Sequence, residues 1–418
     1  MAAKKGIIVI GGGAIGLCVA HFLNGAGHDV TVLDQAAVGS GSSLHNAGLV
    51  CPSHFIPLAA PGMVTTALRW MVNPESPLYV KPRWDAGLAR WLFLFARSCT
   101  SAHVARSMPL LRDMSVASLA LFEEMAGTPG MDFGFRKNGL VMMFRTKHGE
   151  HAALSAAAQA SAIGVEARVL DRGGLSELDP GVEFRASGGV YYPNDAHCTP
   201  ALFIERLHAA LAGRGVRFLT ATAARSFRQR SERITAVVTD GGELPADEFV
   251  LAGGAWSPRI VRGLNLRIPM QAGKGYSVTV RGAAISPRQP YILDEARIAV
   301  TPMGDLLRFA GTMEIAGVTT DITMRRVTAI VRALPAYFGG LDTVRLEEAD
   351  VWAGLRPVSP DGLPFIGRFR RCENLIAATG NAMLGISLAP VTGKLVAGIV
   401  YGTMPSIDLH LLRADRFA

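Results

Sequence analysis

Cysteine is scarce in this chain, and the cysteines present show no pairing pattern. The 418 residues include five cysteines, an odd number, and no C-x-x-C motif joins any two of them. Disulfide-stapled secreted domains and zinc-binding modules both need closely spaced cysteines. The sequence therefore predicts no disulfide framework, no zinc site or other metal centre, and a reducing compartment. The cytoplasm is the expected location.

Long apolar runs and blocks of charge are also missing. No run of about eighteen purely apolar residues occurs, which predicts that no helix crosses a membrane. An apolar strand pattern begins almost at the N-terminus, so a cleaved signal peptide would destroy the fold. The net charge is +8, but the basic residues are scattered and not interleaved with aromatics. We expect no nucleic-acid partner, and the charge favours anionic substrates or an anionic membrane face.

Apolar residues are abundant. They make up 49% of the chain against 18% charged residues, which is typical of a globular protein. The length suggests two or three domains with large buried cores.

The first motif is GIIVIGGGAIG, from Gly6 to Gly16, followed by DVTVLD, which ends at Asp34. An apolar run leads into the glycines, and a helix-compatible run and a second apolar run follow. This order predicts strand, tight turn, helix and strand, with G-x-G-x-x-G at the first turn. A glycine-rich turn without a ligand is the alternative, and the complete βαβ context disfavours it.

Each of the three glycines in G-x-G-x-x-G has a physical purpose. Gly11 permits a sharp turn, Gly13 lets a pyrophosphate approach the backbone, and Gly16 lets the helix pack closely on the strand. The helix N-terminus at Ala14 and Ile15 offers free N–H groups to phosphates. The motif therefore predicts a dinucleotide site.

Asp34 ends the second predicted strand, with Gln35 beside it. A carboxylate at about this offset, roughly twenty residues on, holds the ribose diol of a bound dinucleotide. Its negative charge argues against a 2′-phosphate and so against NADP. The motif alone leaves NAD and FAD open.

A long polar loop of small residues, 39–55, follows, and then an irregular segment rich in proline. Such loops on a rigid scaffold carry binding groups. Residues 89–99 predict an amphipathic helix with Trp91, Leu92 and Phe95 on one face. Packing of that helix on its own domain is favoured over a membrane or partner face.

The middle of the chain alternates helix and strand patterns. Thr199 and Pro200 are expected to begin a helix as N-cap and first residue. The other predicted elements are helices at 115–126 and 150–162, a hairpin over 133–146 turning at Asn138-Gly139, a strand at 216–220, and a β-meander over 224–239 leading to a strand at 249–256.

The last third mixes strands with few helices. The predicted elements are strands at 276–280, 297–301 and 306–309, a helix near 323–337, a loop around Arg356, a strand ending at Thr379, and a helix over 390–401. A glycine-rich loop at 380–387 separates the last strand and helix, as in the opening motif.

With these blocks in place, the chain resembles the FAD-dependent D-amino-acid oxidase/dehydrogenase family, and within it the bacterial D-amino-acid dehydrogenase branch. The resemblance runs nearly end to end. It rests on GGGAIG at 11–16, SSLHNAGLVCP at 42–52, AAPG at 59–62, YPND at 192–195, LAGGAW at 251–256, KGYS at 274–277, GLRPVSPDGLPFIG at 354–367 and TGNAMLG at 379–385.

The resemblance implies an α/β (α+β) fold with two units. A Rossmann-like FAD-binding domain, discontinuous in sequence, would take residues 1–75, 196–258 and 350–418. A substrate-binding domain with a mixed or antiparallel sheet would take 76–195 and 259–349.

The resemblance also implies which residues hold FAD, expected to be bound without a covalent link. Beyond the opening motif, they are Ser42, Ser43, Asn46, Ala47, Gly48, Leu49, Ala224, Gly253, Gly254, Trp256, Gly354, Arg356, Gly380, Leu384, Gly385, Ile386 and Ser387. For the two serines, ordinary hydrogen bonding within the loop is an equal alternative. His45 and Cys51 are expected near the flavin edge without being attached to it.

Three residues are the catalytic candidates. In the family, the arginine that matches Arg356 holds the substrate carboxylate, which suits the two-pronged geometry of a guanidinium. Tyr276 is a candidate pocket wall or hydroxyl donor, and a tyrosine packed in the core is the alternative. His54 lies in the loop expected near the flavin, although a solvated histidine is the simpler reading. Asn381 departs from the histidine of many relatives.

The implied function is dehydrogenation of D-amino acids or cyclic imino acids such as D-proline or 4-hydroxy-D-proline. Hydride would leave Cα for flavin N5, and electrons would pass to a quinone, another carrier or oxygen. One alternative is a glycine/sarcosine-type oxidase. Another is a flavin-carrying subunit that docks a partner near Trp70, Trp84 and Trp91. Peripheral contact with the inner membrane stays open beside a cytoplasmic location.

Overall fold

The chain opens with a parallel βαβ unit. The structure, a computed structural model, describes residues 4–71 and 76–418. Strand β1 (Gly6–Ile10) pairs in parallel with β2 (Asp29–Leu33), and helix α1 (Ala14–Gly25) connects them. Four of the five β1 residues are buried, as expected of a strand covered on both faces. The predicted βαβ unit is confirmed.

This unit forms the centre of a six-stranded sheet with the order β19-β20-β13-β1-β2-β9. The pairings are parallel except for β19 against β20. The remaining strands are β9 (Arg217–Leu219), β13 (Glu248–Leu251), β19 (Phe365–Phe369) and β20 (Cys372–Thr379). Helices and a meander cover opposite faces of the sheet, so both faces are buried.

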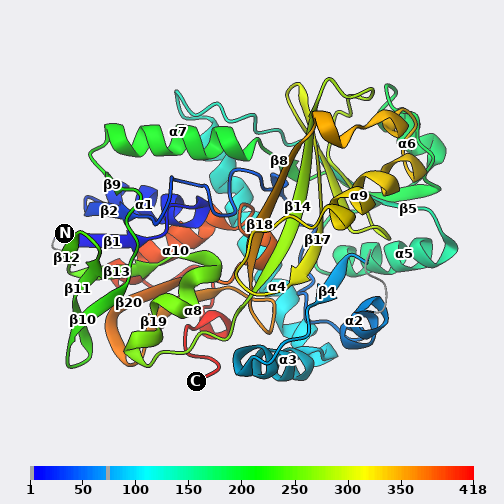
Figure 1. The fold of residues 1–418 in the computed structure, drawn as a ribbon. Coiled ribbons are helices and arrows are strands. Elements are labelled where there is room, and N and C mark those ends of the chain that lie inside the picture. Colours follow the sequence, from blue (N-terminus) through cyan, green and yellow to red (C-terminus); the bar gives the residue numbers. More distant parts are fainter. Residues whose placement is uncertain (1–3, 72–75) are drawn as a thin grey trace.

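Helices α1, α7 (Pro200–Gly213) and α10 (Ala389–Tyr401) pack on one face of this sheet (Figure 1). The meander on the other face consists of β10 (Ser226–Arg230), β11 (Arg233–Thr239) and β12 (Gly242–Pro245). Its Ile234 and Val237 join the core formed by Ile8 and Phe249.

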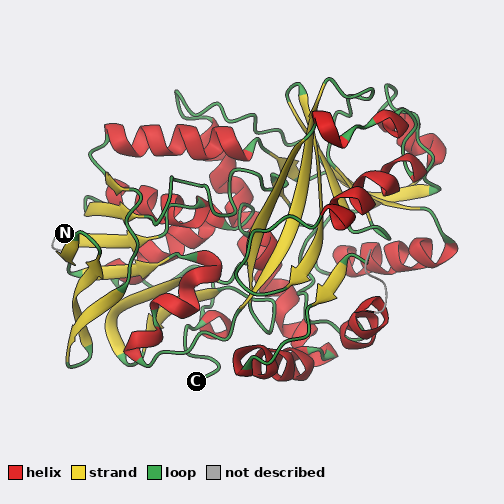
Figure 2. Ribbon diagram, viewed as in Figure 1, coloured by secondary structure: helices red, strands yellow, loops and turns green. Residues whose placement is uncertain are grey.

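A second, nine-stranded sheet lies beside the first (Figure 2). Its order is β18-β14-β17-β16-β15-β5-β7-β6, and β4 pairs with β17. The strands are β4 (Leu78–Val80), β5 (Leu140–Phe144), β6 (Arg168–Asp171), β7 (Gly188–Tyr192), β14 (Gln271–Arg281), β15 (Tyr291–Leu293), β16 (Ile298–Met303), β17 (Leu306–Ile315) and β18 (Asp350–Val358). A short pair, β3 (Leu49–Val50) and β8 (Ala196–His197), lies apart from both sheets in the pairing.

The other helices are α2 (Met63–Met71), α3 (Ala86–Ser98), α4 (Ser101–Ala126), α5 (Lys147–Ala162), α6 (Arg172–Leu178), α8 (Ser257–Ile260) and α9 (Met324–Ala333). Short 3₁₀ turns occupy Gly254–Trp256, Arg262–Leu264, Leu334–Ala336, Leu341–Thr343, Leu346–Glu348, Ala382–Leu384 and His410–Leu412. Helix α9 lies across one face of the second sheet (Figure 1) and contacts β14 and β17.

The predicted helices over 150–162, 390–401 and from Pro200, the strand at 216–220 and the meander are confirmed. The predicted α/β fold with a Rossmann-like sheet and a second, mixed sheet is confirmed as well. Thr199 is the residue before α7, but its side chain makes no capping hydrogen bond.

The predicted hairpin at Asn138-Gly139 is wrong. Strand β5 pairs with β7 and β15, and the segment before the turn forms a single bridge from Arg136 to His197. Phe133 instead joins the core beneath the first sheet. Long-range pairing has overridden a local turn signal.

Other predicted bounds also change. Helix α4 begins at Ser101 rather than at residue 115, and it contains Pro109. Strand β13 ends at Leu251, because Gly254 to Trp256 form a 3₁₀ turn. In α3, Trp91 and Phe95 are buried as predicted, whereas Leu92 is exposed.

The division into two domains stays a prediction. In the sheets themselves, β18 pairs with β14 and so belongs with the second sheet, not the first. Helix α4, expected in the substrate-binding part, contacts α10 and contributes Leu111 and Phe122 to the first core.

Candidate active site

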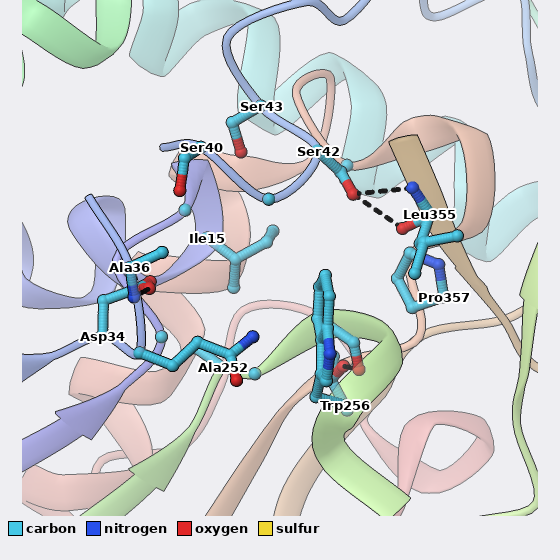
Figure 3. Close-up of a pocket in the computed structure, with 18 of the residues that line it drawn as sticks. Ile15, Asp34, Ala36, Ser40, Ser42, Ser43, Ala252, Trp256, Leu355 and Pro357 are labelled. Atoms are coloured by element: carbon cyan, nitrogen blue, oxygen red, sulfur yellow. Dashed lines mark hydrogen bonds between the residues drawn. The ribbon is translucent and has the colours of Figure 1, made fainter. Parts of the chain in front are cut away.

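A cavity of about 680 Å³ runs from the carboxyl ends of β1 and β2 to β18. Its size is typical of sites for small molecules and cofactors. Figure 3 shows Asp34 and Ala36 at one side of the view and Ser42, Leu355 and Pro357 at the other, with Ile15 and Trp256 between them. The cavity thus lies between the two sheets and is lined by residues of both.

The glycines of the opening motif shape one end of the cavity. Gly11 has φ +114°, and an added Cβ there would overlap the carbonyl of Ala252. Gly13 precedes α1 and supplies no side-chain cap, and the N–H of Ala14 donates to Ser43 Oγ at 3.0 Å. An added Cβ at Gly16 would collide with the Gly11 carbonyl, so Gly16 serves packing outside the cavity wall.

Asp34 lies at the same end, where its carboxylate organises the backbone. It accepts the N–H of Gly12 at 2.7 Å and the N–H of Ala36 at 2.9 Å. Burial raises the pKa of Asp34, and these two hydrogen bonds oppose the shift. Gln35 and Ala224 line the cavity nearby.

The loop over 40–46 forms one long wall, and hydrogen bonds fix its polar side chains. Ser42 Oγ donates to the Leu355 carbonyl at 2.7 Å and accepts the Leu355 N–H at 3.1 Å (Figure 3). Asn46 Oδ1 accepts the N–H of Gly48 at 2.9 Å. The hydroxyls of Ser42 and Ser43 therefore join the loop to β18 and to α1, while both residues also line the cavity. Their contact with FAD stays a prediction.

Arg308 on β17 holds this loop from behind and was not predicted. Its Nη1 donates to the carbonyl of Asn46 at 2.9 Å and to that of Leu44 at 3.2 Å, and its Nε donates to Thr279 Oγ1. Nothing local in the sequence around Arg308 indicates this contact, because the two segments are far apart in the chain.

Arg356 lies on β18 and lines the cavity. The sequence placed it in a loop, which is wrong: Pro357 is tolerated because β18 is an edge strand. An added Cβ at Gly275 would overlap the guanidinium, so this glycine makes room for it. Nη1 donates to the Thr312 carbonyl at 2.6 Å. Burial lowers the pKa of Arg356 to about 10.

Asn381 lines the cavity with its side chain unsatisfied. It is 3% exposed, and both its amide nitrogen and its amide oxygen lack a hydrogen-bond partner among the described residues. A single bridge to Val358 places Asn381 next to the end of β18, near Arg356. A buried amide of this kind needs an occupant with both a donor and an acceptor.

These features fit the flavin dinucleotide that the resemblance implies. The cradle at Gly11 and Gly13 suits a pyrophosphate, Asp34 suits a ribose, and the orphaned Asn381 amide suits a polar ring or the substrate beside it. Gly253, Gly254, Trp256, Gly385 and Ile386 line the cavity, together with Ser42, Ser43 and Asn46. Their predicted contact with FAD fits this position and stays a prediction.

Several other predicted cofactor residues lie outside the wall of the cavity. They are Ala47, Gly48, Leu49, Gly354, Gly380, Leu384 and Ser387. The glycines act through packing: a Cβ at Gly48 would overlap the Cys198 carbonyl, and one at Gly354 would overlap Trp352. Ser387 Oγ accepts the N–H of Cys51. Contact of these residues with FAD stays a prediction.

Tyr276 does not line the cavity. Its neighbour Gly275 faces Arg356, and successive strand residues point to opposite faces. The Tyr276 hydroxyl donates to Glu314 Oε2 at 2.8 Å, and burial is the main reason that its pKa rises to about 12.

His54 does not line the cavity, and it lies in a cluster with Cys51, Ser53 and Asp195. Asp195 accepts the N–H of Ser53 at 3.1 Å and its hydroxyl at 2.5 Å. Burial raises the pKa of Asp195 to about 7, whereas burial and the Arg297 guanidinium lower the pKa of His54 to about 4. Cys51, His54 and Asp195 offer ligand atoms within 4.8 Å of one another. The absence of a metal centre stays a prediction.

Some residues of the cavity wall near β18 were not predicted from the sequence. Thr320, Ile322 and Trp352 line the cavity, and the Trp352 ring stacks on His45 with centroids 4.9 Å apart. None of the three belongs to a recognisable motif. The resemblance pointed to Asn381 only as a departure from the family.

Comparisons with known proteins agree with this geometry. The family described as FAD dependent oxidoreductase (DAO) matches residues 6–399. A D-amino acid dehydrogenase from Granulibacter bethesdensis is 32% identical over 419 residues, covering 99% of both chains.

Solved structures share the fold over the whole chain. Glycine oxidase from Geobacillus kaustophilus superposes with a TM-score of 0.80 at 21% identity, covering 99% of both chains. L-proline dehydrogenase from P. horikoshii gives a TM-score of 0.75 at 18% identity, covering 100% of this chain and 98% of that one.

The cofactor is FAD, and the protein is an oxidoreductase. No helix within 4–71 or 76–418 combines the length and apolar character needed to span a membrane. Because the family match spans nearly the whole chain and a relative of 32% identity covers its full length, this chain belongs to the FAD-dependent oxidoreductase (DAO) family.

Proposed function

We propose that this protein is a dehydrogenase of D-amino acids or cyclic imino acids. The proposed substrates have uncharged side chains, as in D-proline, 4-hydroxy-D-proline and D-alanine. The observation that carries the proposal is the state of Arg356. Its side chain is half-buried on the cavity wall, and no carboxylate among the described residues pairs with it. A partly desolvated cation without a counter-ion favours an anionic ligand.

The chain's own residues would do the positioning. Arg356 would hold the substrate carboxylate through two parallel N–H bonds, while its Nη1 bond to the Thr312 carbonyl fixes its orientation. The Asn381 amide lies close enough to β18 to meet a polar group of the substrate or cofactor. Thr320, Ile322 and Trp352 would exclude water from the reacting carbon. FAD, when bound, supplies the hydride acceptor at N5.

No general base is needed in this proposal. An amino acid that enters with a neutral amine can lose hydride from Cα once its carboxylate is fixed, and position supplies much of the rate gain. The product imine would hydrolyse in water to an oxo acid and ammonia, or leave as a cyclic imine. His54, which does not line the cavity, is not assigned a catalytic step.

The relatives favour the D configuration, whereas the fold does not decide it. The D-amino acid dehydrogenase from Granulibacter bethesdensis is 32% identical along its length, and the L-proline dehydrogenase only 18%. Both enantiomers are therefore compatible with the architecture.

The electron acceptor in this proposal is a quinone or another carrier. An exposed apolar surface on the α2–α3 side supports contact with a membrane face or a partner chain. Trp84 is fully exposed, and Leu68 and Phe93 are 62% and 61% exposed. Arg69, Arg90 and Arg97 belong to the same two helices and add positive charge.

Turnover with an artificial dye tests the proposal. Purified enzyme is given D- and L-proline and D- and L-alanine under air, with dye reduction and peroxide both followed. We expect dye reduction by the D-isomers and little peroxide. Equal activity towards both enantiomers, or none towards either, would show that the assignment is wrong.

A glycine oxidase-type enzyme is the alternative, supported by the superposition on glycine oxidase. The same assay separates the two, because an oxidase would give stoichiometric peroxide with glycine or sarcosine without any dye. A flavin-carrying subunit would instead need a second, co-purifying chain for activity.

A further inference from the structure

A buried network of charged residues lies beneath the second sheet, on the face away from Arg356. Lys274, Tyr276, Glu314 and Arg326 are all at most 7% exposed. Glu314 Oε2 accepts the Tyr276 hydroxyl at 2.8 Å and lies 3.6 Å from Arg326 Nε and 3.7 Å from Lys274 Nζ. Burying such charges is costly, so the arrangement calls for a purpose beyond packing.

This network is tied to one loop, residues 316–323, which connects the end of β17 to the start of α9. Lys274 Nζ donates to the carbonyl of Asp321 at 2.8 Å. The N–H of Thr323 donates to the Tyr276 hydroxyl at 3.4 Å. The Tyr276 oxygen therefore links the loop backbone to the Glu314 carboxylate.

The same loop forms part of the cavity wall. Thr320 and Ile322 line the cavity, and they alternate along the chain with the tethered Asp321 and Thr323. Ile322 is 42% exposed, so the loop lies between the cavity and solvent. The loop has no regular secondary structure. The network holds it through the hydrogen bonds from Lys274 to Asp321 and from Thr323 to Tyr276.

We propose that residues 316–323 are a gate loop over the substrate end of the cavity, and that Tyr276 is the positioning residue that latches it through Glu314 and Lys274. The latch acts through Thr320 and Ile322, which touch the space where the substrate lies. The identity of the substrate in this inference rests on the proposed function. The hydrogen bonds that hold the gate loop do not depend on it. It gives Tyr276 a role that needs no contact with the substrate.

The anchored side of the latch is rigid. Arg326, on α9, donates through Nη1 to the Ser76 carbonyl at 3.1 Å, and its guanidinium lies 4.7 Å from the ring centroid of Tyr79. Glu314 is part of the paired strand β17. Opening of the gate loop therefore needs only the two backbone tethers to break, because the network beneath can stay in place.

Tyr276→Phe tests the latch, and the same hydrophobic core offers a matched control. Tyr337 is a second buried tyrosine whose hydroxyl donates to a glutamate, Glu295 Oε2, at the same 2.8 Å. Neither Tyr337 nor Glu295 lines the cavity. Tyr337→Phe removes an equivalent hydrogen bond without touching the gate loop.

Hydrogen exchange followed by mass spectrometry is the first measurement, with FAD bound in all variants. In Tyr276→Phe we expect amides in 316–323 to exchange about tenfold faster, with peptides from β1 unchanged. Tyr337→Phe should leave the gate loop as in wild type. Lys274→Met, which removes the other tether, should also speed exchange in the loop.

Steady-state kinetics give the second measurement. We expect KM for the D-amino acid to rise about fivefold in Tyr276→Phe with a smaller change in kcat, and discrimination against bulky side chains to fall. Gate-loop exchange in Tyr276→Phe that equals the exchange in Tyr337→Phe would overturn the latch. Failure of every D-amino acid with wild-type enzyme would overturn the proposed function instead, and the exchange result would still decide the latch.

Discussion

The Arg356 guanidinium is oriented on the cavity wall where it can bind an anionic ligand. Its side chain is half-buried, Nη1 donates to the Thr312 carbonyl, and Gly275 leaves space for the guanidinium. Its other N–H groups can donate to a carboxylate that enters the cavity. Screening of that charge-assisted bond by water is weaker there than at a fully exposed surface.

Arg356→Ala should retain FAD but bind carboxylate substrates poorly. Loss of a buried charged hydrogen-bonding partner costs about 2–4 kcal/mol, a fall in kcat/KM by a factor of roughly 30 to 1000. Arg172→Ala is the control, because Arg172 also donates to a backbone carbonyl, that of Ala186 at 3.0 Å, but outside the cavity. Normal turnover of carboxylate substrates by Arg356→Ala would disprove the clamp.

Asp195 gives a prediction about pH. Burial raises its pKa to about 7, so the folded state keeps a proton that the unfolded state has already lost. Its contribution to stability therefore falls as pH rises from about 4 to 7, by up to about 1.4 kcal/mol per unit.

Asp195→Asn cannot lose that proton, so its unfolding free energy relative to wild type should increase with pH over this range. Urea melts at pH 5, 6 and 7 with saturating FAD measure the difference. Histidines such as His54, whose pKa is lowered, give the opposite slope in both proteins and cancel. Parallel pH profiles for the two proteins would show that Asp195 is ionised throughout.

The site residues that the sequence could predict are those that act through local spacing. Gly11, Gly13 and Asp34 follow from the order of strand, turn, helix and strand. Trp352 comes to the cavity through the pairing of β18 with β14, and Thr320 comes there through the loop after β17. No local sequence pattern encodes either placement. Tyr276 was a candidate through the KGYS segment of the resemblance, and only the alternation of β14 shows that its ring lies on the face opposite Arg356.

At the scale of elements, α1 and β1 set how closely the pyrophosphate can approach. The N-terminus of α1 is brought against the turn because Gly16 has no side chain: an added Cβ would collide with the Gly11 carbonyl. Helix α1 also packs on α10, so a displaced α1 would disturb the first core.

Gly16→Ala should therefore weaken FAD binding and stability together. Gly25→Ala is the control, because it lies at the end of the same helix with no atom within 4 Å of an added Cβ. A helical Gly→Ala change with free space is neutral or stabilises by about 0.4–1 kcal/mol. Thermal melts and FAD titrations of both variants test this, and equal behaviour would contradict the packing argument.

Elements were predictable where the pattern is local and the partners are sequential. The βαβ unit, α5, α7 and α10 follow from helical periodicity and cap signals. The Asn138-Gly139 turn misled because β5 pairs with strands distant in the chain. Strand β18 was read as a loop because Gly354 and Pro357 are poor strand residues, yet the glycine makes room for Trp352 and the proline lies on an edge.

At the scale of the whole molecule, the cavity wall is also the junction between the two sheets. Ser42 is hydrogen-bonded to Leu355 in both directions, and Arg308 on β17 holds the carbonyls of the loop at 44–46. A ligand that fills this junction binds the folded state alone and stabilises it, by about 2.7 kcal/mol at a hundredfold excess over Kd. Cofactor binding should therefore raise the free energy of unfolding of the whole protein.

The central claim is that this cavity brings a D-amino acid, held by Arg356, to bound FAD. Anaerobic stopped-flow mixing tests it most directly, because flavin bleaching reports the chemical step without any acceptor. We predict that D-proline or D-alanine bleaches the wild-type flavin far faster than the L-isomers do, and that Arg356→Ala loses this reduction at the same substrate concentration. Bleaching at the same rate by both enantiomers, or unchanged bleaching in Arg356→Ala, would contradict the account.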